Sequence, residues 1–168
     1  EILDIRDMQN VSRGNGDLDP SYSHRINFHY NYTNLTKGRT FMWMLHAQLT
    51  QDYIGQSIAY NPTIDVDGEV YNPLQYSTYE NMDGFMSFRT NISYGFPINP
   101  IKCNLNVMVG ANWSQTPSII NGEMNYTSNM GYDAMVSLGS NISENLDFTL
   151  QWNGAYNDAH QSLAQRGR

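Results

Sequence analysis

Hydrophobic and polar residues alternate along this chain with a period of two, and the alternation recurs in about six separate runs. In the fourth run, for example, Leu105, Val107 and Val109 alternate with Asn106 and Met108. Strict alternation is typical of a β-strand with one apolar and one polar face. The six runs cover residues 21–33, 39–53, 85–96, 101–113, 132–139 and 146–156.

The length of the runs favours membrane-spanning strands over strands of a soluble protein, whereas the placement of charge fits both. Most runs exceed the about 5 or 6 residues of an average globular strand and reach the about 9 to 11 that a tilted membrane strand needs. The apolar set of each run contains no Asp, Glu, Lys or Arg, as a lipid-facing or core-facing surface requires. The charged residues Arg25, Arg89, Lys102, Asp133 and Asp147 fall on the opposite set.

The connections between the runs alternate between short and long. Residues 34–38, 97–100 and 142–145 form short links, whereas 54–83 and 114–130 form long ones. Outer-membrane barrels have short periplasmic turns and longer extracellular loops. The pattern therefore predicts an all-β fold, an antiparallel up-and-down meander of about six long strands that forms a segment of a transmembrane β-barrel.

Aromatic residues cluster at the two ends of the predicted strands, as the two interfacial girdles of a membrane barrel require. One girdle lies beside the short turns and the other beside the long loops. The first comprises Tyr30, Tyr32, Phe41, Trp43, Tyr94 and Phe96, and the second Tyr22, Tyr53, Trp113, Tyr132 and Tyr156.

Composition excludes several functional classes. The formal net charge of -7 gives no electrostatic support for binding nucleic acid. Cys103 is the only cysteine, which excludes an intrachain disulfide framework and a cysteine-rich zinc site. The four histidines lack metal-ligand spacing, so no metal and no cofactor are expected. They are His24, His29, His46 and His160, of which His29 and His46 are predicted to line the polar face.

Two local patterns have a chemical and a structural interpretation. Asp65, Asp67 and Glu69 offer carboxylates to Ca²⁺ in an exposed loop, but Asp67-Gly68 between two short apolar stretches is a strong signal for a hairpin turn, which we favour. A Ser-His-Asn hydrolase on the outer wall is the one enzymatic arrangement that a barrel of this kind offers. No histidine occupies an apolar position deep in a strand, so we expect no enzymatic activity.

The lead-in to the first strand carries a more specific signal. Residues 11–20 read Val-Ser-Arg-Gly-Asn-Gly-Asp-Leu-Asp-Pro and continue into Tyr22-Ser23-His24. Together with Ile5-Arg6-Asp7 before it, this stretch resembles the "GNPDLKPE-YSH" segment of TonB-dependent receptor barrels and related outer-membrane β-barrel proteins. Gly16 replaces a proline and Asp19 a lysine of that pattern. The family places the segment in an extracellular loop before a descending strand, and the loop lengths independently predict the same direction. The resemblance continues through residues 79–84 and 96–98.

The resemblance implies a location in the bacterial outer membrane and a parent protein that takes up a nutrient ligand too large or too scarce for porins. The implied partners are outer-membrane lipid, the remaining strands and plug domain of the parent, and, through the parent, a TonB-type energy-coupling protein. The family's plug, energy-coupling box and final aromatic residue are absent, so we expect a single internal barrel segment over residues 1–168. Within it, 1–20 is a loop-like lead-in, 21–157 contains three long hairpins and 158–168 is a polar tail or loop.

Ligand contact is expected in the long loops, where Tyr and Asn side chains make adaptable polar contacts. The candidate residues are Tyr60, Asn61, Tyr71, Asn72 and Tyr76. The alternative function is a soluble all-β binding or surface domain, in which the six runs close into a small sandwich or barrel with the apolar face inward.

Overall fold

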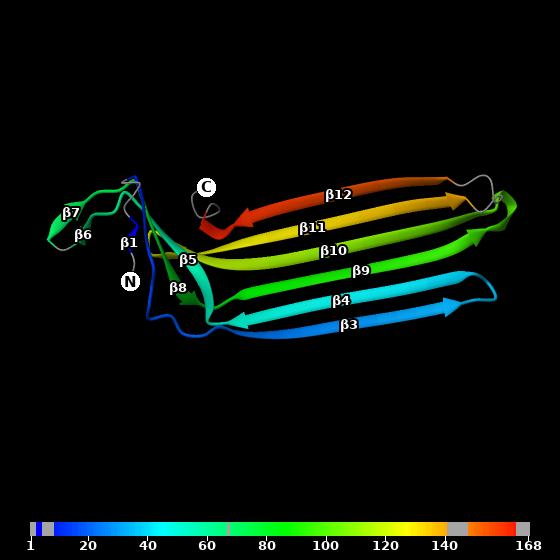
Figure 1. Cartoon of the computed structure of the whole chain (residues 1–168), viewed down its shortest axis with the longest axis horizontal. Coiled ribbons are helices and arrows are strands. Elements are labelled where there is room, and N and C mark those ends of the chain that lie inside the picture. Colours follow the sequence, from blue (N-terminus) through cyan, green and yellow to red (C-terminus); the bar gives the residue numbers. More distant parts are fainter. Residues whose placement is uncertain (1–2, 5–8, 67, 141–147, 164–168) are drawn as a thin grey trace.

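The computed structural model describes residues 3–4, 9–66, 68–140 and 148–163, and strands dominate it (Figure 1). Six long strands lie side by side, each antiparallel to the next along the chain. They are β3 (Tyr22–Asn34), β4 (Arg39–Gln51), β9 (Phe85–Ile98), β10 (Cys103–Ile120), β11 (Glu123–Ser140) and β12 (Thr149–Gln161). Among the described residues, no helix is long and apolar enough to cross a bilayer.

The sheet is more complex than the expected antiparallel meander. The segment predicted as a long loop, 54–83, folds into β5 (Tyr53–Tyr60), β8 (Gln75–Met82) and a separate hairpin of β6 (Ile64–Val66) and β7 (Glu69–Tyr71). These strands gather at one end of the long ones (Figure 1).

Two parallel pairings make the sheet mixed. Strand β5 pairs in parallel with β10, and β2 (Asn10–Arg13) pairs in parallel with β8 and antiparallel with β1 (Leu3–Asp4). The sheet is also open, because within the described residues β3 and β12 each pair along one side only. The all-β prediction is therefore confirmed, whereas a purely antiparallel up-and-down meander is not, because two of the pairings are parallel.

The predicted long loop at 114–130 is also wrong. Strands β10 and β11 each contain 18 residues and are joined directly by Asn121-Gly122. Both turn residues have positive φ, 50° and 79°, as a two-residue hairpin turn of type I′ requires, and Asn-Gly is the dipeptide that favours it. Pro117 is tolerated in β10 because β9 pairing ends at Gln115, so no ladder partner is lost on that side.

The short connections agree better with the sequence. Residues 35–38 form a turn that ends on Gly38 at φ 62°, and a short 3-10 helix, η1 (Asn99–Ile101), joins β9 to β10. The third predicted turn, 142–145, lies outside the described residues. Strand β12 continues to Gln161, so the first residues assigned to a polar tail are in fact paired with β11.

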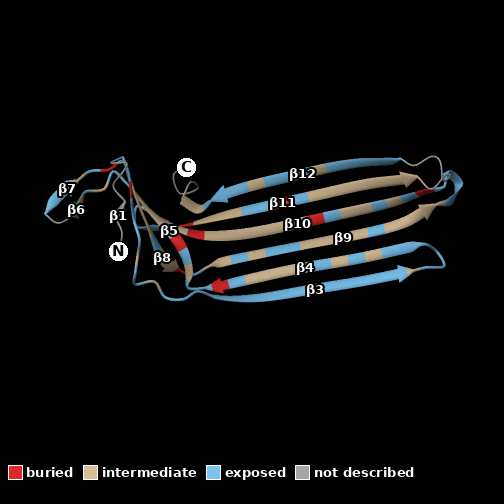
Figure 2. Ribbon diagram, viewed as in Figure 1, coloured by how far each residue is buried: buried red, intermediate tan, exposed pale blue. Residues whose placement is uncertain are grey.

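Strands β5, β6, β7 and β8 together are called the β5–β8 unit. Buried residues are few, and most lie where this unit meets the ends of β4 and β10 (Figure 2). Val11 and Met82 are only 3% and 6% exposed. Gly55 permits this packing, because a Cβ there would lie 3.0 Å from both the Met82 Cε and the Pro117 carbonyl oxygen. The packed core therefore belongs to this unit, whereas the six long strands form a single layer.

A buried asparagine attaches the segment after β12 to the β10–β11 hairpin. Asn125 is 1% exposed, and its Nδ2 donates to the hydroxyls of Ser118 (3.2 Å) and Thr127 (3.5 Å). Its Oδ1 accepts from the Ser162 hydroxyl (3.3 Å) and the Leu163 amide (3.2 Å). All hydrogen-bonding capacity of this amide is used, as burial requires.

Asn125→Ala is predicted to lower the free energy of unfolding by about 1 to 3 kcal/mol, because its partners would remain buried without a hydrogen bond. Urea unfolding of the protein refolded in detergent micelles measures this loss. Asn129→Ala, at an exposed position of the same strand, is the matched control. Equal stabilities of the two variants would contradict the assigned role of Asn125.

Candidate functional site

The six long strands align their apolar positions into rows that cross the whole sheet. Direct cross-strand partners share a face, so each row is continuous from β3 to β12. One row contains Tyr32, Phe41, Tyr94, Val107, Val136 and Trp152, and the next contains Tyr30, Trp43, Ile92, Val109, Ala134 and Gly154.

This apolar face is uncovered. Ile26, Val109, Leu150 and Trp152 are 55% to 68% exposed, although hydrophobic side chains of this size are normally buried in soluble domains. The soluble alternative required this face to form a core. The structure therefore contradicts that alternative for the described residues.

The polar side-chain atoms of Trp43 and Thr90, on the apolar face, are hydrogen-bonded within the sheet. The Trp43 indole N–H donates to the Thr90 hydroxyl at 3.0 Å, and that hydroxyl donates to the Met44 carbonyl oxygen at 3.1 Å. Phe28 packs edge-on against Trp43 with ring centroids 5.0 Å apart. A surface built in this way exposes little unsatisfied polarity, which is what a non-aqueous environment demands.

The apolar character ends abruptly toward the β5–β8 end. Beyond Trp113 and Met130, the same face of the neighbouring strands presents Gln115, Ser128 and His160. The His160 Nε2 lies 2.9 Å from an Asp158 carboxylate oxygen. The β10–β11 hairpin continues past this limit to its turn at residues 121–122.

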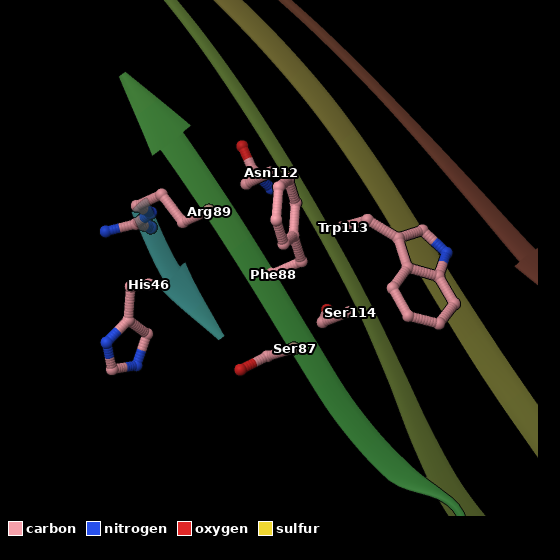
Figure 3. Close-up of a pocket in the computed structure, with 7 residues that line it drawn as sticks. All are labelled: His46, Ser87, Phe88, Arg89, Asn112, Trp113 and Ser114. Carbon is pink, nitrogen blue, oxygen red and sulfur yellow. The ribbon is translucent and has the colours of Figure 1, made fainter. Parts of the chain in front are cut away.

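The opposite face carries the polar set and contains two shallow depressions that share His46 and Arg89. One has a volume of about 450 Å³ and the other about 290 Å³. Figure 3 shows Arg89 and His46 on the side of β9 toward β4, and the Trp113 ring on the side toward β10 and β11. The sequence-based placement of His29 and His46 on this polar face agrees with the register, in which each pairs with a polar-set residue.

The predicted ligand-contact residues all lie in the β5–β8 unit but do not form one cluster. Tyr60 and Tyr76 lie on adjacent strands, and Asn61 follows Tyr60 at φ 51° with its amide bonded to the Leu74 carbonyl oxygen. Tyr71 and Asn72 lie instead at the β6–β7 hairpin. There the Tyr71 hydroxyl donates to Glu69 at 2.6 Å and Asn72 accepts from Thr63. Their contact with a ligand stays a prediction.

The hairpin interpretation of residues 64–71 is confirmed, since β6 and β7 pair and Gly68 has φ 86°. The Asp65 carboxylate accepts from the Gly68 amide at 3.0 Å, an arrangement that stabilises the turn. Asp67 lies outside the described residues. In the described part of the chain, no three His, Cys, Asp or Glu side chains are grouped to hold a metal ion.

The lead-in segment is attached to β8 through asparagine side chains. The Asn81 Nδ2 donates to the carbonyl oxygens of Asp19 and Asp52, both at 2.9 Å, and its Oδ1 accepts from the Asp19 amide. The Asn15 Nδ2 donates to the Tyr79 carbonyl oxygen at 2.9 Å. The segment that resembles a receptor loop is therefore held against the β5–β8 unit.

Asn121, which sequence reasoning missed, joins the β5–β8 unit to the long hairpin. Its Oδ1 accepts from the Tyr60 amide and its own amide donates to the Ile58 carbonyl oxygen, both at 2.8 Å. The Asn121-Gly122 turn signal was visible in the sequence within the region predicted as a loop. The contact with Tyr60 was not, because it joins residues far apart in the chain.

Comparison with protein families identifies the family to which the chain belongs. The sequence model described as "Outer membrane protein beta-barrel family" matches residues 2–167. Comparison with curated proteins gives no match, and comparison with solved structures gives none.

Asn121→Ala is predicted to loosen the β5–β8 unit, because it removes the acceptor for the Tyr60 amide and places a non-Gly, non-Asn residue at positive φ. Hydrogen exchange at that amide should accelerate about tenfold, as the loss of about 1.4 kcal/mol implies. Asn121→Asp keeps an acceptor oxygen and should retain protection. Unchanged exchange in Asn121→Ala would show that the contact does not hold the unit.

Proposed function

Because the chain belongs to the outer membrane protein beta-barrel family, we propose that its long strands form part of the wall of a nutrient-uptake receptor of the TonB-dependent type. It is a protein of the bacterial outer membrane. The observation that carries the proposal is the uncovered apolar face, which is continuous across all six strands and free of charge over its central rows.

The dimensions of the apolar face support contact with lipid. From Cys103 to Trp113 the apolar positions extend about 34 Å along β10, at about 3.4 Å per residue. A strand tilt of about 40° converts this length to about 26 Å of membrane thickness, close to the height of about 25 Å of the apolar band in outer-membrane barrels. The polar positions at Gln115, Ser128 and His160 then lie at the outer interface.

The open edges support further barrel strands as partners. An unpaired N–H or C=O group costs several kcal/mol in hydrocarbon, and the smallest outer-membrane barrels have about eight strands. Strands β3 and β12 each have an edge without a partner among the described residues. In the proposal the parent protein supplies the strands that cover these edges. The plug and the energy-coupling protein are implied by the resemblance of residues 11–24 to receptor barrels.

The β5–β8 unit is proposed as the extracellular part that meets the ligand. It lies beyond the end of the apolar band. The contact of Tyr60 with Asn121 and the contacts of Asn81 with the backbone of residues 19 and 52 give it a defined position. Tyr60 is 51% exposed and available for contact. The proposed role is binding and transport without catalysis.

The orientation of the strands is tested by single cysteines in a Cys103→Ser background of the full-length protein in its native membrane. Val109→Cys is expected to react only with lipid-soluble reagents and Asn106→Cys with water-soluble ones, because they lie on opposite faces of β10. Protection of Val109→Cys from both reagents would place it in a protein core and remove the barrel assignment.

The uptake function is tested in cells limited for one nutrient at a time. Deletion of the protein is expected to abolish growth on at least one scarce nutrient, and inactivation of the inner-membrane energising system should cause the same defect. Normal growth of the deletion strain on every medium, with the intact barrel present in wild-type membranes, would favour a structural or adhesive role.

A further inference from the structure

The polar face of four neighbouring strands is positively charged, although the chain as a whole is acidic with a net charge of -7. On the polar sets of β3, β4, β9 and β10, the described residues include Arg25, His29, His46 and Arg89 and no Asp or Glu. Asp133, on β11, is the nearest carboxylate in register, opposite Gly110. The charge of this face is therefore opposite to that of the rest of the molecule.

The arginines of this surface have no carboxylate partner within the described part of the chain. Neither Arg25 nor Arg89 takes part in an ion pair there, and Asp133 makes none with Arg89. A guanidinium carries five N–H donors and no acceptor, so Arg89 is equipped to bind an oxyanion.

Register places Arg89 and two further polar side chains in one row across three strands. His46 and Arg89 are direct cross-strand partners, and Asn112 is the partner of Arg89 on its other side. The His46 Nδ1 lies 2.5 Å from the Asn27 Oδ1, a contact that holds the imidazole ring beside Arg89. Ser87 and Ser114 add hydroxyls to the depression of about 450 Å³ beside them (Figure 3).

We propose that this surface, defined by Arg89, His46 and Asn112, binds the carboxylate or phosphate group of a small solute inside the barrel. The inference rests on the proposed function only in that the polar face lines the barrel interior. Arg89 supplies the charge and a two-pronged hydrogen bond, and the neighbouring amide and hydroxyl groups supply neutral donors. The depression is large enough for such a group and open to solvent.

The test uses the full-length protein in a nonionic detergent, with inorganic phosphate and citrate as probes and isothermal titration calorimetry as the readout. Wild type is expected to bind at least one probe saturably, and Arg89→Gln should weaken binding about tenfold or more. Arg89→Lys keeps the charge but loses the two-pronged geometry and should give an intermediate affinity. Lys37→Gln removes the same charge from the turn at residues 35–38 and should leave binding unchanged.

Two results would overturn the inference: the absence of saturable binding in wild type, or an equal loss in Lys37→Gln, which would indicate unspecific attraction. Circular dichroism and the altered gel mobility of unheated samples verify that each variant is folded. If Asn106→Cys is accessible to water but neither probe binds, only this inference fails. If Asn106→Cys is inaccessible, the proposed function itself fails.

Discussion

Backbone hydrogen bonding between neighbouring strands is the constraint on which the rest of this structure depends. The six long strands form one layer with little buried side-chain area, so no large hydrophobic core holds them in place. The continuous ladders of β9, β10 and β11 instead satisfy the main-chain groups along both sides of each central strand. The same constraint applies to the two open edges, because their backbone N–H and C=O groups require hydrogen-bond partners in hydrocarbon.

The pairing register of the strands gives the sheet one apolar face and one polar face. Because side chains alternate, a slip of one residue would move the whole apolar set to the other face. The observed register keeps Val109 in line with Ile92 and Ala134, and keeps Arg89 beside His46. The lipid contact and the anion site that we propose are therefore two consequences of a single alignment.

The end of the sheet that carries β5–β8 obeys a different principle. There, hydrogen bonds of side chains, in addition to backbone ladders, hold the chain together. Three asparagines each join segments that are distant in sequence: Asn125, Asn121 and Asn81. Asparagine suits this role because one short amide both donates and accepts. The abundance of asparagine in the sequence thus has a structural explanation at these positions, and the resulting unit can hold exposed tyrosines in fixed positions without a large core.

The sequence by itself determined the strands, their two faces and the class of protein. Period-two alternation and the absence of charge from one set are local properties, so β3, β4 and β9 could be predicted to within about two residues, the usual precision of strand ends. The resemblance of residues 11–24 and the loop lengths agreed on strand direction. The loop at 114–130 was misjudged even though the local Asn121-Gly122 signal was present.

Only the tertiary structure decided the parallel pairing of β5 with β10, the full occupancy of the Asn125 amide and the meeting of His46 with Arg89. Each of these joins residues that lie far apart along the chain. Alternation specifies which way a side chain points, but it does not specify which residue lies opposite. That choice depends on register and on how the 54–83 segment folds back, and both are properties of the assembled sheet.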